Sequence, residues 1–331
     1  MGILFLVNLL TLAAVQQSAQ AVTIKSITVA PAVLTVTSIA LTNGNHASNV
    51  STFWDHIYTT SDVLTATVKF SGAVTVTGNP TLSLNIGGTA KNATYVSGSG
   101  TTELLFTYTI GNQLADTDGI SIDANALSLN GGFINDASTH AAILTHNAVA
   151  DNGDYQVLTI GGSYEGGKIA YFLAIGENIG KRTGTAVESI PYSESAPHGL
   201  IAQTEDISVG IPWAKPAYQN TAVGGTSTLF GTGAANTVAI YQQHLSATTD
   251  YAAGIVMNSS DNGKSDWYLP SAEELNKLWI NRSVVGGFAG GYYGGSSEVD
   301  ANFAWVQVFN FGDQVNVNKG NFDRVRAVRA F

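Results

Sequence analysis

Strict alternation of apolar and polar residues in the first half of the chain is the feature that most constrains its fold. Three runs place apolar residues at every second position: Leu64–Phe70, Leu82–Ile86 and Leu104–Ile110. A period of two points one face of a strand into a core and the other into solvent. Turn residues separate the runs, and no segment between them has the helical period. This half, residues 22–157, is therefore predicted to be an all-β sandwich.

The composition excludes several classes of protein. Only 11% of the 331 residues are charged and 36 are Gly, which disfavours helical bundles and disordered chains. The net charge of −10 argues against nucleic-acid binding, because phosphates need a basic surface. Without cysteine there is no disulfide, Cys-ligated zinc site or thiol catalysis. The length allows two domains, each with its own core.

The N-terminus has the pattern of an export leader. An apolar run, Ile3–Val15, precedes the small-x-small sequence Ala19–Ala21, so residues 1–21 are predicted to be a signal peptide. No Lys or Arg precedes the run, and a buried N-terminal strand or helix is the alternative. The run is too short to span a membrane. We expect a secreted or cell-surface protein with no membrane span after leader removal, and with domains at 22–157 and 158–331.

The first half also resembles the bacterial Ig-like repeats of large surface proteins, in Asp62–Ser71, Val74–Pro80, Ala93–Gly100 and Asp116–Ile120. In that family such domains act as spacers, and the resemblance implies an Ig-like β-sandwich here. The Asp116, Asp118 and Gly119 cluster has oxygen ligands suited to calcium. We interpret it as a polar turn instead, because a complete ligand loop is absent.

The second half mixes strands and helices. Lys168–Ile175 is an apolar run that fits a central strand, and Asn236–Leu245 has helical spacing. A helix is predicted from Ser271, which forms a capping box with Glu274. Its buried stripe is expected to contain Leu275, Leu278 and Trp279.

Two motifs of this half resemble the C-terminal domain of Legionella collagen-like adhesins, which belongs with the C-type-lectin-like folds. They are Ser265–Leu275 and the closing run Arg324–Phe331, and Gly166–Phe172 and His198–Ala202 fit as well. The resemblance implies an α+β C-type-lectin-like domain that binds a ligand. Gly294 and Gly295 stand where the family usually has an aromatic and a Trp before Ser-Ser-Glu.

Several motif residues are expected to be structural. Trp267, Leu269 and Trp305 would be core residues. Arg326 and Arg329 are expected to pair with carboxylates such as Glu273, Glu274 or Glu298.

The segment from Tyr292 to Asp323 is the candidate binding surface. Both faces of its strands are apolar, with Val306, Val308 and Asn310 predicted to face outward from a frame of Trp305, Gln307 and Phe309. The predicted ligand-binding residues are Tyr292, Tyr293, Val299, Asp300, Asn302, Phe303, Val306, Val308, Asn310, Phe311, Asp313, Val315, Val317, Asn321, Phe322 and Asp323.

This segment also resembles the variable region of proteins diversified by retroelements, in which mutation of adenines changes Asn codons to others. The residues within that set are Val299, Asp300, Asn302, Phe303, Val306, Val308, Phe311, Asp313, Val315, Val317, Phe322 and Asp323, and Ala304 joins the fixed frame. The alternative is a set of ordinary strand residues packed against a neighbour.

Three functions remain open. The first is a retroelement-diversified receptor or adhesin for a protein ligand on another cell, phage or host surface. The second is a fixed-specificity lectin-like adhesin for polysaccharide or sulfated glycan, with Lys319, Arg324, Arg326 and Arg329 as its basic cluster if they point outward. The third is a glycan-processing enzyme, which lacks a convincing acid/base pair.

Enzymatic chemistry is poorly supported. Formylglycine-generating enzymes have a related fold but need reactive cysteines. The six histidines are scattered without metal-ligand spacing, and the adjacent Glu273 and Glu274 suit a helix start. We therefore expect a binding protein, not an enzyme, with no catalytic residue, metal or cofactor.

Overall fold

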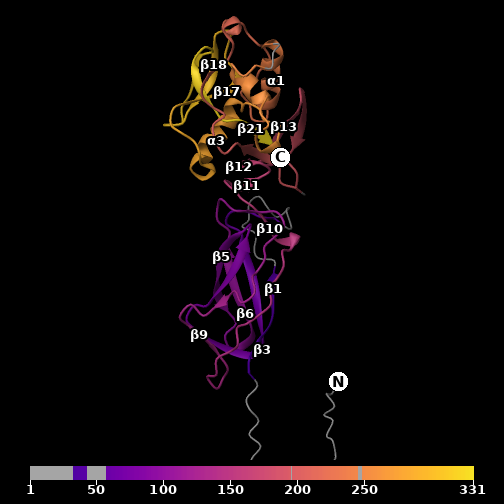
Figure 1. Cartoon of the computed structure of the whole chain (residues 1–331), viewed down its shortest axis with the longest axis vertical. Helices are drawn as coiled ribbons and strands as arrows, with labels where there is room; N and C mark the ends of the chain where they lie inside the picture. The colour runs from indigo at the N-terminus through magenta and orange to yellow at the C-terminus, as the bar shows by residue number, and fades with distance from the viewer. Residues whose placement is uncertain (1–32, 43–56, 195, 245–247) are drawn as a thin grey trace, which may run out of the picture. The chain divides into compact units, whose positions relative to one another are not determined.

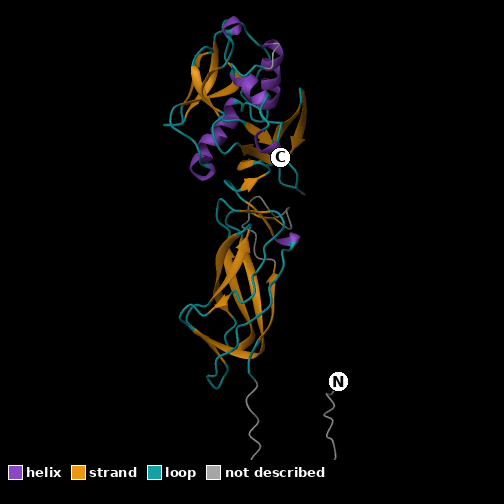
Figure 2. Ribbon diagram, in the orientation of Figure 1, coloured by secondary structure: helices purple, strands orange, loops and turns teal. Residues whose placement is uncertain are grey.

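The structure, a computed structural model, describes residues 33–42, 57–194, 196–244 and 248–331 (Figure 1). The expected leader, residues 1–21, lies outside these ranges, so its prediction is not tested. Strands predominate throughout, and the longer helices belong to the second half of the chain (Figure 2). The β-rich fold class is thereby confirmed. Its assignment to Ig-like and C-type-lectin-like types stays a prediction.

The first half consists of short strands and one 3-10 turn. Its elements are β1 (Val36–Thr42), β2 (Ile57–Tyr58), β3 (Val63–Thr77), β4 (Thr81–Ile86), β5 (Thr89–Ser97), β6 (Thr101–Thr109), β7 (Ala115–Asp116), β8 (Leu127–Ser128), β9 (Phe133–Asn135), η1 (Gly153–Tyr155) and β10 (Gln156–Leu158). Seven strands form one antiparallel sheet in the order β1-β3-β6-β5-β4-β8, with β9 pairing to β3. A small sheet has the order β2-β10-β7.

The alternation seen in the sequence is what builds this half. Leu64, Ala66, Val68 and Phe70 are buried along β3, whereas Lys69 between them is exposed. Leu82, Leu84 and Ile86 of β4 and Leu104 and Phe106 of β6 are buried in the same way and join one hydrophobic core, with Tyr108 partly buried against it. The face of each strand was therefore predicted correctly from its period.

The second half contains all the α-helices of the described residues. Its elements are β11 (Ser163–Tyr164), β12 (Gly167–Phe172), β13 (Asn178–Thr183), β14 (Ala186–Pro191), β15 (Gly199–Ala202), β16 (Ser208–Pro212), η2 (Pro216–Tyr218), α1 (Gly233–His244), α2 (Ala252–Met257), η3 (Asp261–Gly263), α3 (Ala272–Val285), β17 (Tyr292–Glu298), β18 (Phe303–Val308), β19 (Gln314–Asn318), β20 (Phe322–Val325) and β21 (Val328–Ala330).

Two larger sheets organise the second half, and β13 and β14 form a separate two-stranded sheet. One has the order β11-β12-β15-β21, so the last strand of the chain lies in the same sheet as the first strands of this half. The other has the order β16-β20-β17-β18-β19 and carries the candidate binding surface. Strand β12 is central, as predicted, but it ends at Phe172 rather than continuing to Ile175. The predicted helix at 236–245 is α1, and Leu245 lies outside the described residues.

Helix α3 begins as its sequence predicts. The Ser271 hydroxyl accepts a hydrogen bond from the Glu274 amide at 3.3 Å, and the Glu274 carboxylate accepts one from the Ser271 amide at 2.8 Å. Glu274 also accepts the Gly231 amide, which ties α3 to the start of α1. Complete burial raises the pKa of Glu274 to about 7, and the backbone donors oppose that rise. Leu275 and Leu278 are buried as expected, but Trp279 is only half-buried.

Replacing Ser271 by Ala should destabilise the second half. The variant leaves the buried Glu274 amide without its acceptor, so Ser271→Ala should lower the free energy of unfolding by about 1 kcal/mol. Urea unfolding followed by tryptophan fluorescence measures this change. Ser283→Ala, at an exposed position of the same helix, is the matched control and should have little effect. Equal stability of the two variants would contradict the structural role of the cap.

Candidate binding surface

The candidate segment supplies four of the five strands of one sheet. Strand β18 is hydrogen-bonded to β17 on one side and to β19 on the other, and β20 pairs with the far side of β17. Three turns connect or precede these strands, at residues 299–302, 309–313 and 319–321. Strands and turns together determine which side chains reach solvent.

Most of the predicted binding residues do reach solvent. Half-buried positions are Asn302, Val308, Val317 and Asp323. The exposed positions are Tyr292, Val299, Asp300, Phe303, Asn310, Phe311, Asp313, Val315, Asn321 and Phe322. We refer to these fourteen residues as the outer patch.

Aromatic side chains are unusually exposed in the outer patch. Phe311 is 77% exposed, Phe322 74%, Tyr292 49% and Phe303 38%. Among the described residues, Phe133 is the one other Phe, Tyr or Trp that is exposed to this degree. Isolated exposed apolar residues are ordinary on protein surfaces, but several on one short segment indicate an interaction site.

Two predicted binding residues are wrong, because the structure buries Tyr293 and Val306. Val306 is 1% exposed and lies in the middle of β18, an interior strand, where it pairs with Gly294 on one side and Val315 on the other. The Tyr293 ring packs against Phe309, and its hydroxyl donates to Asp206 at 2.9 Å. Burial raises the pKa of that hydroxyl to about 12.

Three of the four expected frame residues are buried. Ala304, Gln307 and Phe309 are buried, whereas Trp305 is half-buried rather than part of the core. Sequence reasoning also missed Val209 on β16, which is 74% exposed on the strand beside β20. No local signal connects Val209 to the segment, since the pairing of β16 with β20 joins residues far apart in the chain.

The turn that carries Phe311 is held without using the Phe311 side chain. The Gly312 amide donates to the Val308 carbonyl at 2.7 Å, and the Gln307 side chain donates to the Gly312 carbonyl at 2.7 Å. Gly312 has a φ of 96°, and any Cβ there would overlap the ring of Trp279. The turn is therefore held by its backbone and by Gln307, and the phenyl ring of Phe311 is left exposed.

The other two turns are built similarly. The Asp300 carboxylate accepts the amides of Asn302 and Phe303, at 2.7 and 3.0 Å. Beyond β19, the Asn318 side chain accepts the Gly320 amide, and Asn321 donates to the Asn318 carbonyl just before Phe322. Oδ1 of Asp300 thus stabilises its own turn, as Asx side chains commonly do. Its other carboxylate oxygen, Oδ2, is the one available to a partner.

Three of the four cations proposed for a sulfated-glycan site are buried, and all four are paired with carboxylates. Lys319 is fully buried in an ion pair with Glu298. Arg326 is also fully buried, with its Nε 2.9 Å from Asp206, and Arg329 pairs with Asp266 and Glu165. The half-exposed Arg324 joins Asp206 at 3.1 Å. Pairing of Arg326 and Arg329 with carboxylates was predicted correctly. The expected partners, Glu273, Glu274 or Glu298, were wrong, because the two arginines pair with Asp206, Asp266 and Glu165 instead.

Asp323 is the outer-patch residue whose carboxyl pKa is shifted from its ordinary value. Its Cβ lies 3.7 Å from the position that a Cβ on Gly294 would occupy. Among the described residues no hydrogen bond or ion pair reaches its carboxylate. Burial raises the pKa of Asp323 from its ordinary value of 3.8 to about 6. A desolvated carboxylate without a partner costs stability, which is common at functional sites.

Asp116 and Glu273 each accept backbone hydrogen bonds. Asp116 accepts the Gly87 and Gly119 amides at 2.7 and 2.8 Å, which fits a polar turn rather than a calcium ligand. Glu273 accepts the Phe230 amide at 2.7 Å. Within the described ranges, no three His, Asp or Glu side chains are grouped to hold a metal ion. None of the helices there is both long and apolar enough to cross a membrane.

Comparison with known proteins gives little further guidance. No family model and no curated protein matches the chain. Among solved structures, the chain matches a fimbrial protein from Bacteroides ovatus at 13% identity, over 82% of this chain and 76% of that one, with a TM-score of 0.34. This score is too low to support an argument about fold or function. The Ig-like, lectin-like and retroelement resemblances stay predictions.

Asp323→Asn should stabilise the protein at neutral pH. The raised pKa means that the folded state favours the protonated carboxyl, so the Asp323 contribution is most favourable below pH 3.8 and is lost as the pH rises towards 6. At pH 7 the variant should gain about 1 kcal/mol, allowing for partial exposure. The gain should shrink at pH 4.

Thermal and urea unfolding of Asp323→Asn at both pH values measures this effect. Asp313→Asn, at an exposed position of the same patch, is the control and should be neutral. A destabilised Asp323→Asn protein at pH 7 would show that the carboxylate has a favourable partner.

Proposed function

We propose that this chain is a recognition protein that binds a partner through the outer patch. The observation that carries the proposal is the exposure of Phe311, Phe322, Tyr292 and Phe303 on one strand-and-turn segment. Aromatic side chains on ordered backbone lose little conformational entropy on binding and bury a large apolar area. Such residues are typical anchors of protein interfaces.

The polar residues of the patch favour a protein ligand. The outer patch contains the acidic residues Asp300, Asp313 and Asp323, whereas the cations proposed for a sulfated-glycan site are engaged in ion pairs. A sulfated glycan would meet carboxylates rather than guanidinium groups at this surface. A protein surface with apolar pockets and basic or neutral rims is complementary to it.

We also propose that the outer patch is diversified by a retroelement. Of the twelve positions assigned to the variable set, Val306 is buried, and the others are exposed or half-buried. Substitution at those eleven positions would leave the core unchanged. The buried Ala304, Gln307 and Phe309 are the fixed frame in this hypothesis, which matches their structural importance.

The proposed scaffold is an Ig-like spacer carrying a C-type-lectin-like binding domain, secreted or displayed at the cell surface, that acts without catalysis. The sequence resemblances support this assignment. The all-strand first half and the α+β second half are compatible with it.

Replacing either of the two most exposed aromatic residues, Phe311 or Phe322, by Ala should weaken partner binding while the fold remains intact. Fluorescently labelled protein is tested on intact bacterial cells, phage particles, cultured host cells and an array of immobilised glycans. The Phe311→Ala and Phe322→Ala variants should each weaken binding at least about tenfold, which is 1.4 kcal/mol. Their melting temperatures should match that of the parent, since both side chains face solvent.

Phe133→Ala is the matched control, because Phe133 is 60% exposed in the first half and lies outside the patch. Binding that survives both patch substitutions, or that Phe133→Ala removes equally, would contradict the proposal. Binding to a glycan on the array that depends on the patch would favour the fixed-specificity lectin-like adhesin.

Diversification predicts a pattern of natural variation. Among closely related isolates, substitutions should concentrate at the variable positions. The locus should also contain an imperfect repeat of the last ~40 codons and a reverse transcriptase gene. The substitutions should correspond to adenines of that repeat. Locus sequencing checks this. Val306 should vary only among small or β-branched apolar residues, because its side chain is buried. Variation spread evenly over frame and patch codons would argue for a fixed adhesin.

A further inference from the structure

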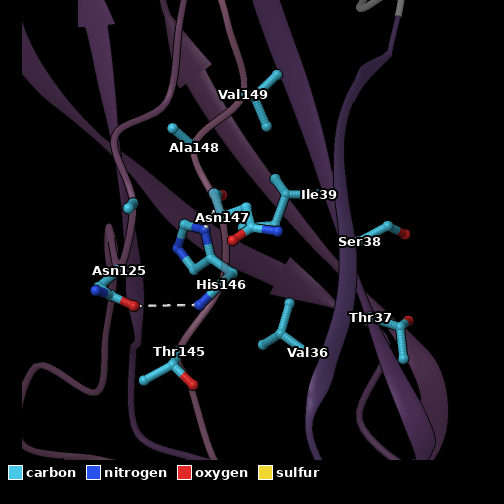
Figure 3. Close-up of a pocket in the computed structure, with 11 residues that line it drawn as sticks. Val36, Thr37, Ser38, Ile39, Asn125, Thr145, His146, Asn147, Ala148 and Val149 are labelled. Atoms are coloured by element: carbon cyan, nitrogen blue, oxygen red, sulfur yellow. Dashed lines mark hydrogen bonds between the residues drawn. The ribbon is translucent and has the colours of Figure 1, made fainter.

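A groove lies between strand β1 and the segment at residues 145–149, in the first half of the chain (Figure 3). Its volume is about 640 Å³. Val36 and Ile39 line it from β1, and Asn125, His146 and Asn147 line it from the opposite side. None of its lining side chains is an acid, Lys or Arg. The groove is therefore neutral, with two aliphatic residues on one wall.

One wall of the groove is the outer edge of an edge strand. Strand β1 pairs with β3 on one side only, at the end of the seven-stranded sheet. Its outer edge is covered at both ends. Ile143 exchanges hydrogen bonds with Val36 and Leu34, and the Tyr155 hydroxyl donates to the Leu41 carbonyl. Between these ends, no described segment pairs with the outer backbone of residues 37–40.

The opposite wall presents a second backbone edge. The His146 amide and carbonyl bond to Asn125, at 3.2 and 3.3 Å. Successive residues of an extended chain point their backbone groups to opposite sides, so the Thr145 amide is on the side away from Asn125. The His146 ring accepts the Ala126 amide at Nε2 and contacts the Asn147 carbonyl through Nδ1, which fixes this wall in place.

An extended chain fits a slot between two strand edges better than a compact ligand does. Its amides and carbonyls can bond to both walls, as in recognition by strand addition. The uncovered stretch of β1 is four residues, or about 13 Å, long. An edge of this kind is an aggregation liability unless something covers it.

We propose that the groove binds residues Val22–Ala30 of a second copy of this chain, so that copies assemble head to tail. Six of these nine residues are β-branched, none is Gly or Pro, and Lys25 is the one charged residue. Such a sequence forms strands readily and is itself an aggregation hazard when unpaired. The segment lies between the expected leader and β1, joined to Leu34 by Pro31–Val33.

Insertion into the chain's own groove is disfavoured by the geometry. Folding back from Leu34 would require a reversal within Pro31–Val33, a span of at most about 11 Å. The first pairing position beside β1 is already occupied, because Ile143 bonds to both Leu34 and Val36. A second copy avoids the first obstacle, because its segment is not tethered to the groove that it enters, and it can pair with residues 37–40 beyond the position that Ile143 occupies. Since donor segment and groove are different surfaces, the contact repeats and yields chains of copies.

The test uses the chain from Val22 to Phe331, with light scattering after size exclusion over a range of concentrations. We expect concentration-dependent oligomers. Asn147→Trp, which fills the groove, and Ser26→Pro, which spoils the donor strand, should each give monomers. Asn92→Trp, at an exposed position of β5, is the control and should still assemble. Mixing the two defective variants should restore dimers, because one retains a groove and the other a donor.

Amide hydrogen exchange gives an independent readout. Residues 37–40 and 145–148 should exchange more slowly in oligomers than in either monomeric variant. A parent protein that stays monomeric at all concentrations overturns the proposal, and so do oligomers that persist in Asn147→Trp. A third outcome also overturns the proposal. If the parent is monomeric and Ser26→Pro speeds amide exchange at residues 37–40, the segment inserts into the groove of its own chain. Partner binding by the outer patch is unaffected by any of these outcomes.

Discussion

Burial of the Arg326 guanidinium is the constraint on which the second half depends. Its donors reach the Asp206 carboxylate and the carbonyls of Gln203 and Gly287, and its plane lies 4.2 Å from the centre of the Phe288 ring. A buried charge is tolerated only when its donors are satisfied, so these segments must be in place together. Asp206 also accepts from Tyr293 and Arg324, which fixes β17 and β20 to the same point.

In this arrangement, one set of residues stabilises the fold and a different set forms the exposed surface. The buried pairs Lys319–Glu298 and Arg326–Asp206, together with the Tyr293–Phe309 contact, lie beneath strands whose opposite residues reach solvent. The turns that carry the exposed rings are closed by backbone groups and by short polar side chains. Changing an outer side chain therefore removes few native contacts, whereas changing a frame residue removes many. A surface of this kind can alter its specificity without losing its fold.

Local patterns predicted a large part of this structure, and long-range pairing accounts for the rest. The alternation in Leu64–Phe70 and the Ser271–Glu274 capping box depend on residues a few positions apart, and both were read correctly. The burial of Val306 could not be predicted, because β18 has apolar residues on both faces and the period alone does not say which face is covered. The partners of Arg326 and Arg329 lie at Asp206 and Asp266, at separations that no motif encodes. Val209 was missed for the same reason.

The packing of Trp279 beneath Gly312 has an optical consequence. The indole is half-buried, its Nε1 has no hydrogen-bond partner among the described residues, and the Arg282 guanidinium lies 4.3 Å from its ring. It is thus adjacent to the turn that presents Phe311, in surroundings whose polarity depends on how much water reaches that turn. A ligand that covers this turn should therefore change the contribution of Trp279 to the intrinsic fluorescence of the protein.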